Sequence, residues 1–366
     1  MFRTHCVLCK DPQLSPIFTL ENYPITPSSS TTGPETDETE DCTFAACSAC
    51  GALQLQNLID PVKLYQHSHN STENTPTWKE HHKAFSEFIV SASPGQILEI
   101  GGNSGTLYKF LSDRISDYTI LDICDSEKRP QTVKFLKGNC ETFDLSGHPH
   151  IAMSHTFEHL YFPRTFVENL AKANVKSICI SIPNMDHLLA SKNILLLHNE
   201  HTYFVAEKEL TYLFSLVGYS CKRSEAFKKH SSFYEFIPSG THAVPISPRQ
   251  ELAINLKEIL TSFETSVRAV TIDTPFFICP GGHYGQKIAY YLRPFHQYIR
   301  GFLDNDTSKQ GLRVYGTNVK VYSPDVLREF QETRVCVVLY AGPYTEELKA
   351  QLGLLHSDIQ YITLSS

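Results

Sequence analysis

The chain has 366 residues, 41% hydrophobic and 19% charged, which is enough to bury more than one core, and we expect two or three structural units. The net charge of −7 does not favour binding to nucleic acid or to an anionic membrane surface. No stretch reaches the roughly 20 apolar residues that span a bilayer, and the polar start MFRTHCVLCK is unlike a signal peptide. Eleven cysteines, several within apolar runs, favour reduced thiols and a cytoplasmic location over a disulfide framework.

Two C-x-x-C pairs open the sequence: Cys6 with Cys9, and Cys47 with Cys50. Four thiolates at this spacing suit a tetrahedral Zn²⁺, which would stabilise a small lobe without an open position for chemistry. The polar, acidic segment 28–40 between the pairs has no periodicity, so it is predicted to be a mobile surface loop. A zinc-binding lobe is therefore expected over residues 1–74.

A glycine-rich turn follows the next apolar run. After a predicted helix at 75–90, residues 96–105 read QILEIGGNSG and lead into a predicted helix at 106–111. Glycines permit a tight turn and a close approach to a ligand, and nucleotide-type cofactors use such a unit at the carboxyl ends of parallel strands. The spacing differs from the dinucleotide motif G-x-G-x-x-G, and an ordinary turn beside a core strand is the alternative. Asp122, at the end of the next predicted strand, lies where a ribose would be held.

The rest of the chain alternates strands with helices. Apolar runs predict strands at 118–123, 151–155, 177–182, 219–223 and 232–236, with helices at 163–173 and 207–217. These elements imply a largely parallel sheet covered on both faces, which we place at residues 75–240. A long amphipathic helix at 248–270 then leads to a second α/β unit, placed at 241–366. Its turn at Pro280-Gly281-Gly282 would either hold a phosphate at a helix start or be a plain tight turn.

Histidines and glutamates recur in two short motifs of the central unit. SHTFEH (154–159) follows a predicted strand, and HNEH (198–201) lies in a loop between a strand and a helix. Histidine moves protons near neutral pH, and a neighbouring carboxylate can orient it. H-x-E-H also suggests a metal site, but its flanks do not read as the helix that such a site needs. One of the Glu-His pairs is therefore predicted to be catalytic, with hydrogen-bonded structural histidines as the alternative.

Taken in order, these motifs resemble the bacterial nucleotide-deoxysugar C-methyltransferases. The order is the four-cysteine lobe with CSACGALQL (47–55), then EIGGNSG, SHTFEH, NEHTYF and a C-terminal glycine-turn domain that carries YGTNV (315–319). The resemblance covers nearly the whole chain. It implies an α/β fold in which a class I S-adenosylmethionine methyltransferase (Rossmann-like) core joins a small zinc-binding N-terminal lobe and a C-terminal Rossmann-like domain that binds substrate.

The resemblance also implies a mechanism and its residues. A base removes the proton beside the ketone of a nucleotide-linked keto-sugar, and the enolate attacks the sulfonium methyl. His201 is expected to be the base, Glu200 to orient it, and His159 to stabilise the enolate. S-adenosylmethionine is expected to be held by Glu99, Gly101, Gly102, Asn103, Gly105 and Asp122, and structural Zn²⁺ by Cys6, Cys9, Cys47 and Cys50.

The chain departs from the family pattern at four places: Ser104 in the cofactor loop, Tyr315-Gly316-Thr317 near the C-terminus, and two places among the expected active-site residues. His198 replaces a tyrosine and is counted with His159, Glu200 and His201 as a catalytic residue, and His67, His69 or Asn70 stands in for an active-site tyrosine. Two other functions therefore stay open: an O- or N-methyltransferase of a sugar or other small metabolite, and a catalytically degenerate zinc-braced binding module. The expected partner is a nucleotide-diphosphate sugar or similar small molecule, with no nucleic acid or membrane, in a monomer or weak homo-oligomer.

Overall fold

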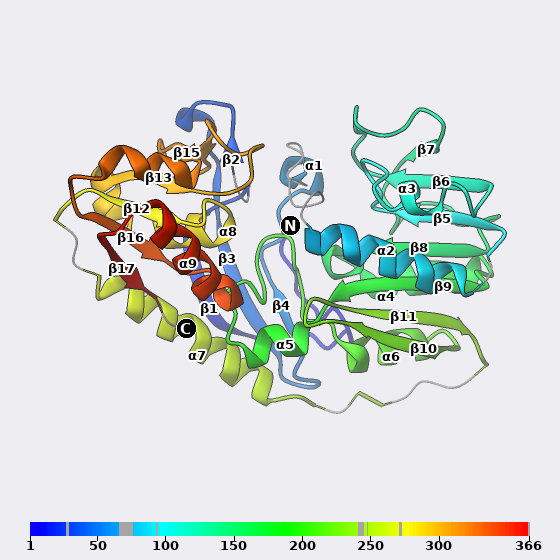
Figure 1. Ribbon diagram of the computed structural model, residues 1–366. Coiled ribbons are helices and arrows are strands. Elements are labelled where there is room, and N and C mark those ends of the chain that lie inside the picture. The colour runs from blue at the N-terminus through cyan, green and yellow to red at the C-terminus, as the bar shows by residue number, and fades with distance from the viewer. Residues whose placement is uncertain are drawn as a thin grey trace.

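The structure is a computed structural model that describes residues 1–26, 29–65, 76–92, 94–240, 245–246, 248–270 and 273–364. Two α/β units stand on either side of an N-terminal lobe built on antiparallel strands (Figure 1). None of the helices in the described ranges is both long and apolar enough to cross a membrane.

The first unit contains a seven-stranded sheet. Its strands are β5 (Gln96–Ile100), β6 (Asp117–Asp122), β7 (Lys134–Lys137), β8 (His150–Ser154), β9 (Ser177–Pro183), β10 (Tyr219–Phe227) and β11 (Ser231–Pro238). They lie in the order β10-β11-β9-β8-β5-β6-β7, and β11 runs antiparallel to both of its neighbours. Numbered within the unit, this is 3-2-1-4-5-7-6 with an antiparallel seventh strand, the arrangement of the class I methyltransferase fold. The predicted fold is therefore confirmed.

Helices cover both faces of this sheet because its strands are apolar on both sides. β9 (SICISIP) is buried at every position, as expected for a strand between two helical layers. On one face Ile97 packs with Phe85 of α2 (Pro76–Val90), next to the short α3 (Tyr108–Leu111). On the other face Leu98 belongs to the core that holds α4 (Pro163–Lys172) and α6 (Glu207–Ser215). The alternation of neighbouring residues thus fixes which helix covers which face.

The second unit is a parallel five-stranded sheet. It comprises β12 (Phe276–Cys279), β13 (Ile299–Leu303), β15 (Val321–Tyr322), β16 (Val335–Leu339) and β17 (Ile359–Thr363). The strand order β15-β13-β12-β16-β17, with all pairs parallel, is the 3-2-1-4-5 order of a Rossmann-like domain. Its helices are α7 (Glu251–Arg268), α8 (His283–Tyr291) and α9 (Thr345–Leu355).

The N-terminal lobe is fastened to both units. Its sheet of β1 (Leu14–Pro24), β3 (Thr39–Cys47) and β4 (Leu53–Leu55) lies between them in Figure 1, with α1 (Pro61–Leu64) following. The buried Arg3 donates hydrogen bonds to the carbonyls of Leu55, Tyr161 and Thr202. Tyr290 of α8 donates to the carbonyl of Glu21 (2.8 Å). The lobe therefore fixes the positions of segments from both halves of the chain.

The part of segment 28–40 that the structure describes, residues 29–40, is not the unstructured loop that its composition predicted. β2 (Ser29–Ser30) pairs antiparallel with β14 (Arg313–Val314), and a 3₁₀ turn follows at Pro34–Thr36. Asp37 forms an ion pair with Arg313 (2.6 Å), in which both side chains are only 8% exposed. The prediction failed because the arginine that neutralises this acidic segment lies far along the chain, where local composition gives no sign of it.

Candidate functional site

The four predicted zinc ligands meet at one end of the lobe. Cys6 Sγ lies 3.5 Å from Cys50 Sγ, and Cys9 Sγ lies 3.6 Å from Cys47 Sγ. All four sulfur atoms lie within 4.8 Å of one another, and none is in a disulfide. Four sulfurs bound tetrahedrally to one zinc ion at about 2.3 Å would be roughly 3.8 Å apart, so the group has the shape of a closed structural site.

The electrostatics of this cysteine group also fit a cation. The pKa of the Cys6 thiol is raised by its hydrogen bond with Cys50 and by burial, and burial also raises the pKa of Cys9. The Leu8 amide donates to Cys6 Sγ at 3.4 Å, as backbone amides do to metal-bound thiolates. A divalent ion would offset the cost of ionising neighbouring buried thiols. The cysteine group could therefore hold a metal ion.

A cavity of about 170 Å³ opens at the carboxyl ends of β5, β6 and β8. The strand order reverses between β5 and β8, and open α/β sheets bind ligands at such a switch point. Each neighbouring strand contributes its following loop to the lining. The lining includes Tyr65, Ile100, Gly101, Asn103, Asp122, Cys124, Asn139, Glu141, His155, Thr156, His159, Tyr161 and Glu200.

Glu99 and the glycines shape the turn at the bottom of this cavity. Glu99 is buried under the turn and accepts a hydrogen bond from the Tyr118 hydroxyl (2.9 Å). A Cβ on Gly102 would lie 2.5 Å from the Glu99 carboxyl carbon, and one on Gly101 would lie 2.2 Å from Thr156 Oγ1. The predicted residues Gly101 and Asn103 line the cavity, whereas Glu99 acts from below by holding the turn in place.

Asp122 closes β6 and faces the same cavity. Its carboxylate accepts the backbone amides of Asn103 (3.0 Å) and Cys124 (2.9 Å), so it joins the ends of β5 and β6. Burial raises the pKa of Asp122 and these two amides oppose that change. The carboxylate retains acceptor capacity toward the cavity, which suits the hydroxyl pair of a ribose.

His159 and Glu200 form the other wall. His159 belongs to a 3₁₀ turn, η3 (Phe157–His159), and its Nδ1 is bonded to the Tyr65 hydroxyl at 2.7 Å. Glu200 Oε2 lies 3.8 Å from Nε2 of His283, which is the first residue of α8 in the second unit. His198 and His201 do not line the cavity; their rings are tilted at 39° with centroids 4.1 Å apart, and burial lowers the pKa of His201 to about 3. All four predicted catalytic residues thus belong to one cluster.

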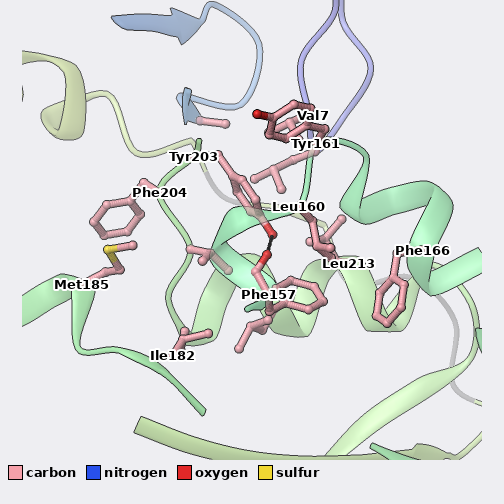
Figure 2. Packing of buried hydrophobic residues seen from close by; sticks show 14 of the residues in the cluster. Val7, Phe157, Leu160, Tyr161, Phe166, Ile182, Met185, Tyr203, Phe204 and Leu213 are labelled. Carbon is pink, nitrogen blue, oxygen red and sulfur yellow. Dashed lines mark hydrogen bonds between the residues drawn. The ribbon is translucent and has the colours of Figure 1, made fainter. Parts of the chain in front are cut away.

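Hydrogen bonds to backbone carbonyls explain why two distant loops meet here. The Tyr203 hydroxyl donates to the carbonyl of Phe157 (2.8 Å), a bond drawn in Figure 2 within the surrounding apolar core. The Thr202 amide donates to the carbonyl of Glu158 (3.2 Å), and the Thr202 hydroxyl donates to that of Leu160 (2.8 Å). The loop after β9 is therefore fixed against the loop after β8.

Two residues of this cluster, Tyr65 and His283, were missed as site residues in the sequence, and Glu158 was named only as the partner of His159 in a Glu-His pair. Tyr65 was taken only as the neighbour of the segment expected to supply a tyrosine, yet it reaches the cavity itself. His283 comes from the other unit, so no local pattern links it to Glu200. Glu158 stands beside His159 in the motif, but its complete burial is visible only in the structure. The proposed stand-ins His67, His69 and Asn70 lie outside the described residues.

The turn at residues 280–282 is packed as a plain turn rather than opened toward a phosphate. A Cβ on Gly281 would lie 3.1 Å from Phe302 and 3.2 Å from Val321. Lys309, the cation near Gly282, is already paired with Asp304 at 3.2 Å. What the turn does is direct His283, the next residue, toward Glu200.

Comparisons with known proteins give matches in structure only. No protein-family model and no curated protein matches the chain. Magnesium protoporphyrin IX methyltransferase from Synechocystis PCC 6803 with bound SAH matches with 15% identity and a TM-score of 0.38, over 50% of this chain and 90% of that one. The N-methyltransferase NodS from Bradyrhizobium japonicum matches with 13% identity and a TM-score of 0.37, over 47% and 93%. These scores are low, and the assignment of a class I methyltransferase fold rests on the strand order given above.

Proposed function

We propose that the protein is an S-adenosylmethionine-dependent C-methyltransferase that acts on a keto-sugar linked to a nucleotide. The observation that carries this proposal is one cavity at the switch point of the sheet, lined by Asp122 on one side and by His159 and Glu200 on the other. A ribose-binding carboxylate and proton-moving groups around one space are what a transfer from a nucleoside cofactor to a small molecule requires. We assign residues 1–74 to a zinc lobe, 75–240 to the core and 241–366 to substrate binding.

The residues at the bottom of the cavity suit the cofactor. Gly101 and Asn103 let the backbone approach a ligand closely, and Asp122 offers a carboxylate to ribose hydroxyls. When bound there, S-adenosylmethionine supplies an electrophilic methyl group. Glu141 and Cys140 line the same side of the cavity, after β7.

The residues at the other wall suit the formation of a carbanion beside a ketone. The sequence assigned proton removal to His201, but Glu200 and His159 are the members of the predicted set that line the cavity. We therefore assign proton removal to Glu200, with His283 placed 3.8 Å away to share the proton. His159, whose ring is fixed by Tyr65, faces the same space and is suited to stabilise the developing oxyanion.

Two measurements test this function. Calorimetry should detect binding of S-adenosylmethionine to the full chain, and a mass-spectrometric screen of nucleotide keto-sugars with labelled cofactor should find a product that gains one methyl group. Absence of cofactor binding would contradict every methyltransferase assignment. Methylation of oxygen or nitrogen instead would leave the cofactor site intact and overturn only the choice of carbon.

The role of Glu200 has its own test. Deuterated water should exchange the proton beside the ketone in the presence of the protein, and Glu200→Gln should slow that exchange by about 10²-fold or more. Glu207→Gln, a carboxylate-to-amide change on the exposed start of α6, is the matched control. Exchange at the normal rate in Glu200→Gln would move the base elsewhere in the cluster.

A further inference from the structure

Two buried groups beside the cavity lack the partners that buried polar atoms ordinarily have. Glu158 is 0% exposed, and neither of its carboxylate oxygens has a hydrogen-bond partner among the described residues. The Nδ1 atom of His201 is also buried and has no hydrogen-bond partner among the described residues. Removing a carboxylate from water without donors or a cation costs several kcal/mol in general, so such a group either keeps a proton or is satisfied by a ligand. Burial raises the pKa of Glu158 to about 8, and a bound cation would let it ionise.

Imidazoles surround the Glu158 carboxylate. His159 Nε2 lies 3.9 Å and His155 Nδ1 lies 3.5 Å from Glu158 Oε1. Glu158, His159 and His201 each offer one ligand atom, and these three atoms lie within 4.8 Å of one another. We propose that Glu158, His159 and His201 bind a divalent transition-metal ion at the edge of the cavity.

The donor set fits an open site better than a closed one. Two imidazoles and one carboxylate suit Zn²⁺, Mn²⁺, Fe²⁺ or Co²⁺, and three protein ligands leave room for a water or a substrate atom. Ligands of one ion at bond lengths of about 2.1 Å are roughly 3.0–3.5 Å apart, so the side chains need to close by about 1 Å. Of the three ligands His159 lines the cavity, so the proposed site lies at the edge of the cavity.

Neighbouring groups already hold the ligands in the orientation that an ion needs. The Tyr65 hydroxyl bonds to His159 Nδ1 at 2.7 Å, which leaves Nε2 directed toward Glu158. His155 Nε2 is bonded to the Ser231 hydroxyl at 2.8 Å, and its Nδ1 faces Glu158. Hydrogen bonds of this kind to the second ring nitrogen are characteristic of metal-ligating histidines and of their surroundings.

Two other nearby groups also consist of potential metal ligands, but they suit a metal ion less well. One comprises His81, His155 and His230, which offers no carboxylate and in which one ring nitrogen of each histidine is bonded to a serine hydroxyl: His81 Nε2 to Ser181, and the other two to Ser231. Its only buried nitrogen without a partner among the described residues is His81 Nδ1. The other comprises His198, Glu200 and His283, in which Glu200 already faces His283 and the cavity. Glu158 stands apart because its carboxylate is enclosed and unsatisfied.

An ion at this position would act on a substrate oxygen. In its open position the ion would bind the oxygen on which negative charge develops when the proton leaves carbon for Glu200. It would then take over the stabilisation assigned above to His159, which would act as a ligand of the ion. The substrate class is then one that presents a carbonyl, enolate or hydroxyl oxygen to the ion. This role rests on the proposed function, whereas binding of the ion does not.

Equilibrium binding of Mn²⁺, and separately of Co²⁺, to the zinc-loaded full chain tests the proposal without cofactor or sugar. Mn²⁺ prefers oxygen and imidazole over thiolate, so it leaves the cysteine group undisturbed. We expect one equivalent to bind, and Glu158→Gln and His201→Asn each to weaken binding at least tenfold. Glu168→Gln, a change at a half-buried carboxylate of α4 that pairs with Arg164, should leave the affinity unchanged.

Variants of the two other histidine groups show which of the three groups binds the ion. His230→Asn and His283→Asn should retain Mn²⁺ affinity within about twofold, because each alters a different group. Loss of binding in either one with retention in Glu158→Gln overturns the proposal, as does absence of saturable binding of both ions. If Glu158→Gln fails to fold, the Mn²⁺ affinities of His201→Asn and of Glu158→Asp, which keeps a carboxylate, test the proposal in its place. Cofactor binding without ion binding would leave the proposed function standing and remove only this inference.

Discussion

Two groups of side chains in this protein have the composition of a metal site, and they differ in what surrounds them. The cysteine group (Cys6, Cys9, Cys47 and Cys50) consists of four sulfurs with pairs 3.5 and 3.6 Å apart, enclosed by the apolar core of the lobe. The Glu158–His159–His201 group mixes oxygen with nitrogen and reaches the cavity through His159. The first is complete with protein ligands alone, while the second has three and an open side.

This difference separates a role in stability from a role in chemistry. The cysteine group joins the start of the lobe to the end of β3, so an ion there would tie together two segments of the lobe that lie far apart in the sequence. The second group lies between two large cores that fold by apolar packing, so an ion there is not needed for the fold. Removing a ligand of the cysteine group should therefore lower stability, whereas removing a ligand of the second group should lower activity and leave the fold intact.

The largest effect is expected from Cys50→Ser. Structural zinc contributes about 10–16 kcal/mol in isolated zinc domains, which exceeds the ~5–15 kcal/mol stability of a typical domain. We expect the variant to lose its zinc and the lobe to unfold, as measured by metal content and thermal unfolding. Cys42→Ala, a buried thiol of β3 outside the group, should keep its zinc. A normal metal content and melting temperature in Cys50→Ser would contradict the structural role.

A second buried carboxylate of the cavity, Glu141, sharpens the contrast with Glu158 because it has a partner. It accepts the amide of Phe162, and burial raises its pKa from 4.5 to about 7. The folded protein therefore keeps a proton that the unfolded chain has lost, so the free energy of unfolding should fall as the pH rises from about 5 to 7 and then level off. The expected change is at most about 3 kcal/mol.

Urea unfolding of the wild type and of Glu141→Gln over pH 5.5–8 measures this contribution. The difference between the two proteins cancels the titration of the cysteine thiols, which both share. We expect the variant to gain stability relative to the wild type as the pH rises, because its amide stays neutral. A pH-independent difference would show that Glu141 titrates normally.

Local signals in the sequence were enough for the features that depend on neighbouring residues. The strand and turn at 96–105 were predicted from an apolar run and its glycines, and the structure has β5 and the turn at the same place. Alternating strands and helices gave the fold class, because parallel sheets need covered faces. The prediction was less complete in the lobe, where β1 is long, half-exposed and without a continuous apolar run.

Contacts between distant residues could not be predicted in this way. Glu158 meets His201 only because Thr202 and Tyr203 bond to the loop after β8, and nothing in either motif indicates that pairing. His283 reaches Glu200 from the other α/β unit. The burial that separates Glu158 from an ordinary surface glutamate is a property of the folded core.

A smaller effect is expected from Asp122→Asn. Hydrogen bonds to a charged acceptor contribute about 1.5–3 kcal/mol, so the affinity for S-adenosylmethionine should fall by about 10–100-fold. Asp122 accepts the Asn103 and Cys124 amides on separate oxygens, and the one amide oxygen of Asn can keep only one of these bonds, so we also expect a loss of stability of about 1–3 kcal/mol. Calorimetry measures the change, with Asp125→Asn, an exposed neighbour, as the control. Equal affinities in both variants would move the ribose away from β6.

The smallest effect is expected from Tyr65→Phe, which tests the Glu158–His159–His201 group. The substitution removes the hydrogen bond to His159 Nδ1 while keeping the ring that stacks on the imidazole at 6.1 Å. Stability should change by about 1 kcal/mol, whereas Mn²⁺ affinity should fall about tenfold, because an imidazole without this bond is held less firmly toward Glu158. Tyr108→Phe, which removes a hydroxyl bonded to Thr132 outside the cluster, is the matched control. If Tyr65→Phe loses stability but keeps its affinity for the ion, then the Tyr65–His159 bond serves the fold rather than the orientation of a ligand.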